Sequence, residues 1–170
     1  MNRRHFLVTT LAAGTTMTHA SPSGAVQSIP QALQWLEQLG QAGSVTTTGA
    51  WPLVAILEHM AQSVEMSLDG FPAPKSALFQ STVGAAAFAV FQWRGRMSHG
   101  LAEPIPGAPA LTLQGDWKPA AQRLRAALLR FDAHTGALKP HFAYGALSKS
   151  DFAQAHVLHI ANHQDEIVVR

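Results

Sequence analysis

The chain has 170 residues, of which 47% are apolar, and this is enough for one domain with a hydrophobic core and too little for two. It has no cysteine, which excludes thiolate metal ligands, disulfide bonds and a cysteine nucleophile. The 12 basic residues outnumber the 10 acidic ones by two, and Arg3 and Arg4 in a predicted leader account for this excess. The rest of the sequence is close to neutral, so we expect no nucleic-acid partner and no anionic membrane partner.

The first 20 residues are predicted to be an export signal. A twin arginine, Arg3 and Arg4, precedes a mildly apolar run at residues 8–17, and Ala20 ends a small-x-Ala cleavage pattern. The run is too short and too rich in threonine and glycine for a membrane anchor. We therefore expect the twin-arginine translocase as a partner and a periplasmic or otherwise exported location. An ordinary secretory signal, or a frayed N-terminus with accidental arginines, is the alternative.

A flexible lead-in at residues 21–27 is expected to precede a helical domain at residues 28–170. The first helix of this domain follows at once, because Ser28 can cap it and Pro30 suits its first turn. Apolar residues then recur at helical spacing until Gly40, where the helix is predicted to end.

A second helix is predicted to open at Trp51-Pro52 and to run to about Leu68. His59 lies on the flank of its apolar stripe, where a side chain can point into a space between helices near one end of a bundle. The stripe itself consists of Leu53, Leu57, Met60, Val64 and Leu68.

A further helical segment is predicted at residues 75–93, and it is apolar on nearly every side. Such a helix is either wholly buried or lies at a subunit contact, so a homodimer is one expectation. Gln80, Thr82 and Gln92 interrupt the segment, which excludes a membrane span.

Two irregular loops are predicted, at residues 95–117 and 134–147, with an amphipathic helix starting at Pro119 between them. The first loop is rich in proline and glycine and carries His99, and the second carries His141 and the only tyrosine, Tyr144. Long ordered loops in compact domains are often functional. We therefore treat both histidines as candidate substrate contacts and Tyr144 as a candidate proton donor, with ordinary loop residues as the alternative.

The last helix carries three histidines on one face. Ser148 and Asp151 are spaced to cap it, and His156, His159 and His163 then fall within a sector of roughly 60° that also holds apolar side chains. Burying three imidazoles costs free energy unless each has a partner, and one shared cation would satisfy all three while needing them neutral. Three separately hydrogen-bonded core histidines are the alternative.

A metal site can be assembled from two facing helices. His59 on the second helix can meet His159 and His163, which are spaced four apart on the last. Three histidines leave one or more positions open on a divalent cation, as in catalytic sites, and zinc, nickel, iron and manganese all fit such ligands. His156 would be a fourth ligand or a pocket wall.

Four carboxylates lie close in sequence to these histidines. Each could orient the second nitrogen of a ligand or act as a base, and each has a solvated helix surface as the alternative role. They are Glu58, Glu65, Asp165 and Glu166.

No alternating strand pattern, repeat or heptad is present, and the HExxH, GxSxG and phosphate-loop motifs are absent. The expected fold class is therefore all-α, with four main helices, one inserted apolar helix and a long Pro/Gly loop.

Several strings of the sequence together carry a family resemblance. They are Trp51-Pro52-Leu53, 56–65, Gly70-Phe71-Pro72, Phe79, Val83-Gly84, 95–100, 104–109, 140–145 and 155–163. They resemble the domain-of-unknown-function family 1569 over nearly all of residues 28–168. That family is similar to the DinB-like superfamily of metal-binding helical bundles.

The resemblance implies a DinB-like four-helix bundle that binds a divalent metal, often zinc or nickel, through His59, His159 and His163. Some members of the superfamily resemble thiol S-transferases or metal-dependent hydrolases. This chain departs from them in the inserted segment 74–117 and in Asn162-His163-Gln164-Asp165, which replaces their usual His-His-Arg-Gly. The resemblance therefore does not carry a substrate or a cytosolic thiol cofactor over to this chain.

Three functional hypotheses follow. The first is an exported metal-dependent hydrolase or transferase that acts on an unknown small molecule by activating a water or thiolate at the open position. The second is a non-catalytic metal-binding or scavenging protein. The third is a structural or interaction bundle that is metal-free and dimerises through residues 75–93.

Overall fold

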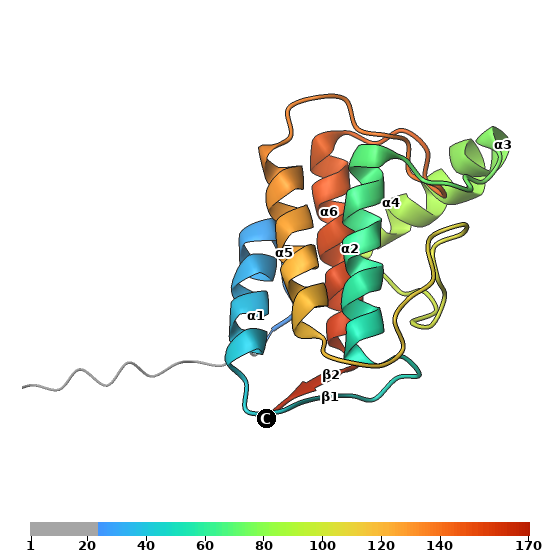
Figure 1. Ribbon diagram of the computed structural model, residues 1–170. Coiled ribbons are helices and arrows are strands. Elements are labelled where there is room, and N and C mark those ends of the chain that lie inside the picture. Colours follow the sequence, from blue (N-terminus) through green and yellow to red (C-terminus); the bar gives the residue numbers. More distant parts are fainter. Residues whose placement is uncertain (1–23) are drawn as a thin grey trace, which may run out of the picture.

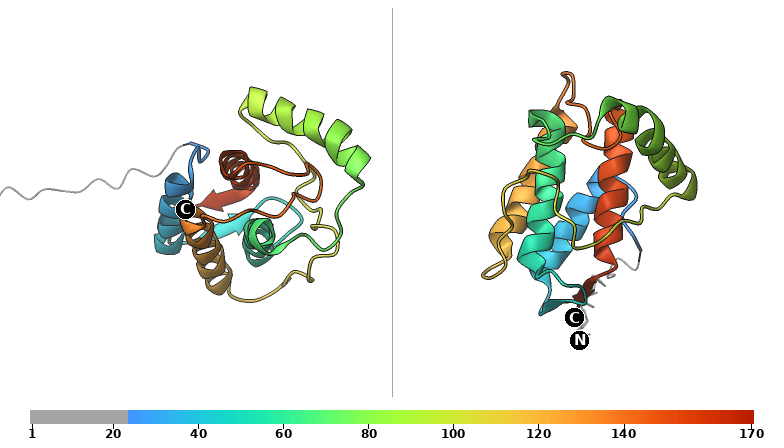
Figure 2. Two further views of the ribbon diagram at one scale, coloured as in Figure 1. Left: turned by 90° about the horizontal axis from the view of Figure 1, so that it is seen from above. Right: turned by 90° about the vertical axis from the view of Figure 1, so that its right-hand side faces the viewer.

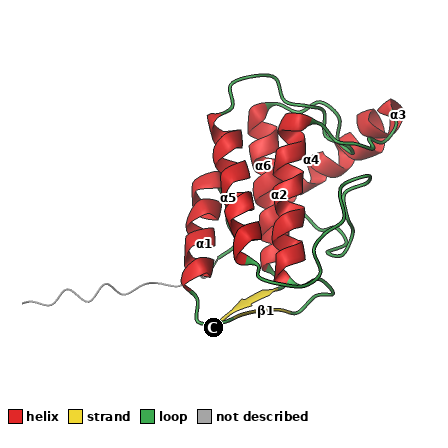
Figure 3. Ribbon diagram, viewed as in Figure 1, coloured by secondary structure: helices red, strands yellow, loops and turns green. Residues whose placement is uncertain are grey.

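The computed structural model describes residues 24–170 and is mainly helical (Figure 3). The predicted export signal, including Arg3 and Arg4, lies outside the described residues. Within them, no helix is both long and apolar enough to span a membrane. In chain order the elements are α1 (Ile29–Gln41), β1 (Val45–Thr47), α2 (Leu53–Asp69), α3 (Ala77–Phe79), η1 (Gln80–Gly84), α4 (Ala85–Arg94), α5 (Lys118–Ala133), α6 (Lys149–Gln164) and β2 (Ile167–Val169).

Helices α1, α2, α5 and α6 lie side by side and enclose the hydrophobic core (Figures 1 and 2). Both α5 and α6 contact α1 on one side and α2 on the other. The apolar stripe predicted for the second helix is buried along its whole length. The most deeply buried large side chains of the core include Leu39, Leu57, Met60, Leu124, Leu128, Phe131, Phe152 and Ile160.

The helix ends follow the capping chemistry of the sequence. The Ser28 side chain accepts a hydrogen bond from the backbone N–H of Gln31 at the start of α1. At the start of α6, Ser148 and Asp151 form the expected reciprocal capping box. Upstream of α1, Val26 is buried in the core and its N–H donates to the side chain of Gln164, so packing begins within the expected lead-in.

The expected all-α class is confirmed to the extent that the fold is mainly helical, and the structure adds one feature that the sequence did not predict, a two-stranded antiparallel sheet of β1 and β2. Val45 pairs with Val169, and Thr47 pairs with Ile167. Strands of three residues are too short to show an alternating pattern, and this pair joins segments that are far apart in the sequence. The sheet ties the C-terminal end of the chain to the segment that leads into α2 (Figure 1).

The apolar segment 75–93 forms α3, η1 and α4, which lie outside the four long helices (Figure 2). It is not wholly buried, because the side chains of Leu78 and Trp93 are 74% and 85% exposed. Phe88 is buried and stacks on Tyr144, with ring centroids 5.1 Å apart. The expectation that this segment is wholly buried is therefore wrong, and its contact with a second subunit stays a prediction.

The proline-rich loop 95–117 is held against α2. The carboxylate of Glu58 accepts hydrogen bonds from the backbone N–H and the hydroxyl of Thr112, at 2.7 and 2.9 Å. The side-chain amide of Gln62 donates to the carbonyl of Pro109. Met97 and Ile105 are buried, so this loop is a packed part of the domain that can line a site.

Candidate metal centre

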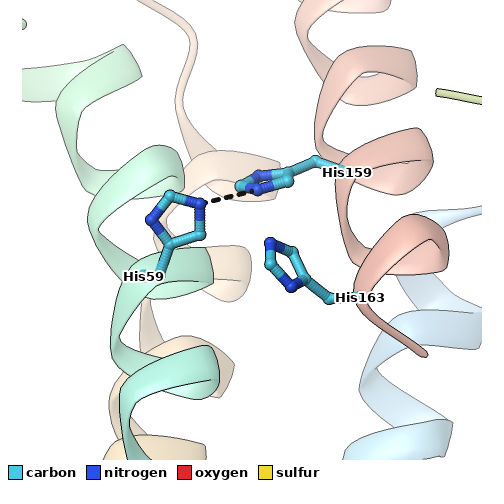
Figure 4. A group of neighbouring side chains, drawn as sticks. All are labelled: His59, His159 and His163. Atoms are coloured by element: carbon cyan, nitrogen blue, oxygen red, sulfur yellow. Dashed lines mark hydrogen bonds between the residues drawn. The ribbon is translucent and has the colours of Figure 1, made fainter. Parts of the chain in front are cut away.

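Three histidine side chains converge between α2 and α6 (Figure 4). His59 comes from α2, and His159 and His163 come from α6. One nitrogen of each lies within 4.8 Å of the other two, and the Nε2 atoms of His59 and His159 are 3.0 Å apart. All three residues are buried. We call them the histidine group.

The sequence spacing explains this convergence. His159 and His163 are four residues apart, which places both side chains on one face of α6, one turn from each other. Helix α2 packs against both α5 and α6. Both the apolar stripe of α2 and the flank that carries His59 are therefore buried. Trp51 packs beside the group, with its ring centroid 5.1 Å from that of His59 and 6.4 Å from that of His163.

Burial keeps the three imidazoles neutral. Loss of hydration, followed by the nearby His99, lowers the pKa of His59 to about 4. Burial also lowers the pKa of His163 to about 3 and takes that of His159 well below its ordinary value, with smaller contributions from neighbouring histidines. Neutral imidazoles have a free lone pair, which is the form that binds a metal ion.

Glu166 fixes the orientation of His163. The Nδ1–H of His163 donates to Oε1 of this carboxylate at 2.7 Å, and both residues are buried. Burial raises the pKa of Glu166 and lowers that of His163, so the contact is not driven by a full ion pair. The bond to Nδ1 leaves Nε2 of His163 as the lone-pair nitrogen, as in carboxylate–histidine–metal arrangements.

Two buried imidazole nitrogens, Nε2 of His163 and Nδ1 of His59, lack a hydrogen-bond partner among the described residues. A buried polar atom without a partner costs about 1–3 kcal/mol. A cation would remove this cost for Nε2 of His163. It would also replace the hydrogen bond between His59 and His159, in which one nitrogen must carry a proton. The donor set therefore fits a divalent metal that prefers imidazole.

The family of the chain is established by residues 23–170, which match the family described as "Protein of unknown function (DUF1569)". The chain belongs to the DUF1569 family. The match confirms the family resemblance of the sequence strings. No curated protein and no solved structure shows a significant match to the chain.

In this DUF1569 protein a cavity of about 240 Å³ adjoins the histidine group. His59 and His159 form part of its wall, and the loop residue His99 lies beside them, with its ring centroid 5.0 Å from that of His159. The other candidates from the sequence, His141, His156 and Tyr144, also line the cavity. The cavity is thus shared by α2, α6 and both irregular loops.

His156 lies on the cavity wall and not in the histidine group. Its Nε2 is 3.1 Å from the hydroxyl oxygen of Ser67, and its ring packs edge-on against Phe131. His156 was expected to be either a fourth ligand or part of the pocket wall, and it lies in the pocket wall.

Of the four candidate carboxylates, Glu166 is the one that contacts the histidine group. Glu65 was a candidate pocket or orienting residue, with a solvated helix surface as the alternative role, and its carboxylate pairs with Arg123 at 2.7 Å. Six residues separate it from His59, which turns its side chain about 120° away around α2. Glu58 binds Thr112, and Asp165 is exposed.

Several residues at the site were not identified from the sequence. Ser67 was not singled out because a serine late in a helix has no distinctive signal, and its role depends on contact with His156. Lys75 and Glu103 reach the cavity from segments whose path depends on tertiary packing. Glu166 was a candidate from the sequence, but its buried position against His163 depends on the packing of the segment just before β2, a strand that the sequence pattern did not predict.

Proposed function

We propose that this DUF1569 protein binds a divalent cation through His59, His159 and His163 and uses it for hydrolysis or group transfer on a small molecule. The observation that carries the proposal is the convergence of three neutral, buried imidazoles, one of them with an unpartnered Nε2. Zinc and nickel are the first candidates, and iron and manganese also suit imidazole ligands.

The chain's own residues would divide the work around the cation. His59, His159 and His163 would hold it, and Glu166 would keep the proton on Nδ1 of His163. The ring of Trp51 packs against His59 and His163 on one side of the group. When bound, such a cation supplies Lewis-acid activation of a water or thiol. The adjoining cavity gives a substrate room beside the ligands, and this favours an enzyme over a metal-scavenging protein.

We further propose that the fold is a DinB-like four-helix bundle built from α1, α2, α5 and α6. The side-by-side packing of these helices supports this, as does the pair of histidines four apart on α6 facing one histidine on α2. The twin arginine supports export to the periplasm as part of the same proposal.

Titration of the metal-free protein with zinc in a calorimeter tests the proposed site. We expect a single tight site in the unaltered protein and its loss in His59→Ala, His159→Ala and His163→Ala. His134→Ala is the matched control, because this histidine lies on the loop after α5 and is not part of the group. Unchanged zinc affinity in His163→Ala would overturn the proposal.

A further inference from the structure

The cavity has polar lining besides the histidine group, from His141 and His156, and we call these two side chains its polar end. His156 and His159 both line the cavity and are three residues apart on α6, a rise of about 4.5 Å along the helix. His141, from the loop 134–147, also lines the cavity, and it lies close enough to His156 for that ring to lower its pKa. A ligand that reaches both His156 and the histidine group is therefore small.

The protonated nitrogen of His156 is fixed by Ser67. The Ser67 hydroxyl donates its only proton to the carbonyl of Val64 at 2.7 Å. Its oxygen can then only accept from the Nε2 of His156, 3.1 Å away. His156 must therefore carry its proton on Nε2, which leaves a lone pair on Nδ1.

The protonated nitrogen of His141 is fixed by the backbone. Its Nδ1 accepts hydrogen bonds from the N–H groups of Ala143 and Tyr144, at 3.1 and 3.2 Å. Because Nδ1 is the acceptor, the neutral ring carries its proton on Nε2. The ring also stacks on that of Tyr144, with centroids 4.2 Å apart and planes only 5° from parallel.

Both rings are uncharged at neutral pH. Burial lowers the pKa of each to about 3, and the nearby His156 lowers the pKa of His141 further to a smaller extent. At pH 7 both rings are therefore neutral. The two side chains therefore suit hydrogen bonding better than general acid–base catalysis.

Together the two rings offer one donor, Nε2–H of His141, and one acceptor, Nδ1 of His156, and no described residue bonds to either atom. A carboxylate would bring a second acceptor against the lone pair of His156, and an ammonium would bring a second donor against His141. A hydroxyl or a primary amide both donates and accepts. The formal charges that line the cavity, on Lys75 and Glu103, belong to exposed side chains.

We propose that the cavity binds a small uncharged molecule whose hydroxyl or primary amide hydrogen-bonds to Nε2–H of His141 and Nδ1 of His156. Apolar lining from Met97, Ile105 and Phe142 receives the hydrocarbon part of the molecule. The assignment of this molecule as the substrate rests on the proposed metal-dependent function, since its other end then faces the histidine group. The polar recognition itself does not depend on a metal.

The first test measures the two tautomers directly. Long-range ¹H–¹⁵N correlation spectra of the metal-free protein at neutral pH distinguish a ring protonated on Nε2 from one protonated on Nδ1. We expect Nε2–H for both His141 and His156. A proton on Nδ1 in either ring would overturn the proposal without any substitution.

The second test uses three probes with the same four-carbon chain length, butanamide, butanoate and butylammonium, added to the metal-free protein. We expect butanamide to shift the ring signals of His141 and His156 and to bind at least about tenfold more tightly than the two ions, because each ion leaves a buried group unpaired. His156→Phe should remove this preference, and His134→Ala should keep it. Equal binding of all three, or no binding of butanamide at its solubility limit, would overturn the proposal.

The two proposals fail separately. Because the probes are added without metal, their binding tests the polar end of the cavity alone, whereas the zinc titration tests the histidine group alone.

Discussion

Substituting Gly49 by alanine should weaken metal binding without altering any ligand. Gly49 lies between β1 and α2, beside the carboxylate that orients His163. A Cβ on this residue would overlap Oε2 of Glu166 and lie 3.1 Å from its Cδ. Gly49 is not among the glycines with positive φ, so its backbone conformation itself tolerates alanine. The effect of Gly49→Ala is therefore steric and is directed at Glu166.

The size of the effect follows from the shift that the carboxylate must make. Glu166 has to move Oε2 away from the new methyl group, and we expect this movement to disturb the 2.7 Å hydrogen bond between its Oε1 and Nδ1 of His163. Removing such a partner of a metal-binding histidine typically weakens metal affinity by about 10–100-fold, which corresponds to about 1.4–2.7 kcal/mol. Glu166→Ala removes the carboxylate altogether and sets the upper limit for the effect of Gly49→Ala.

Competition for zinc against a chromophoric chelator measures the affinity, and thermal unfolding of the metal-free proteins measures stability. Gly40→Ala is the matched control, because this glycine lies in α1 with open space where a Cβ would lie. The control should bind zinc normally and gain about 0.5–1 kcal/mol of stability. Unchanged zinc affinity in Gly49→Ala would refute the orienting role of Glu166.

Three further predictions concern pH, self-association and the surface. The free energy of unfolding of the metal-free protein should fall by about 1.4 kcal/mol per pH unit for each of His141 and His156, as the pH falls from about 6.5 towards their folded pKa of about 3. The reason is that these histidines take up protons in the unfolded chain but not in the folded chain. Urea midpoints that do not change with pH would contradict this. If α4 contacts a second subunit, Trp93→Lys should reduce the mass seen in sedimentation equilibrium, and a monomer in both proteins would exclude the dimer. Glu65→Gln should leave zinc affinity unchanged and cost less than about 1 kcal/mol, because its pair with Arg123 is on the surface; weakened zinc binding would restore Glu65 as a site residue.

The helices could be predicted from the sequence because each combines an apolar period with a recognisable start. Ser28 and the Ser148–Asp151 pair mark two helix starts, and the structure has both caps where the sequence placed them. The small sheet could not be predicted, since three-residue strands carry almost no pattern and Val45 meets Val169 only after the helices have packed.

The apolar segment 75–93 shows a second limit. Its composition predicts burial, and yet Leu78 and Trp93 are largely exposed in the single chain. An apolar composition predicts that a segment packs against other apolar groups, but it does not predict whether these belong to the same chain or to another molecule.

The histidines of the candidate site could be selected from spacing, because a pair four apart on a helix must share a face. The residues around these histidines could not be selected from the sequence, since their positions depend on contacts between distant segments. Both Glu65 and Glu166 were candidate carboxylates in the sequence, with Glu65 preferred as a pocket residue. The packing of the structure separates them, because Glu166 contacts His163 whereas Glu65 pairs with Arg123.

The metal content of the protein tests the central claim most directly. The chain should be expressed from residue 21 without a histidine tag and compared with a His159→Ala/His163→Ala double variant by plasma mass spectrometry. We expect about one zinc, nickel, iron or manganese ion per chain in the unaltered protein and none in the variant. If neither protein holds metal, even after reconstitution, the histidine group is a hydrogen-bonded part of the core and the proposed function is wrong.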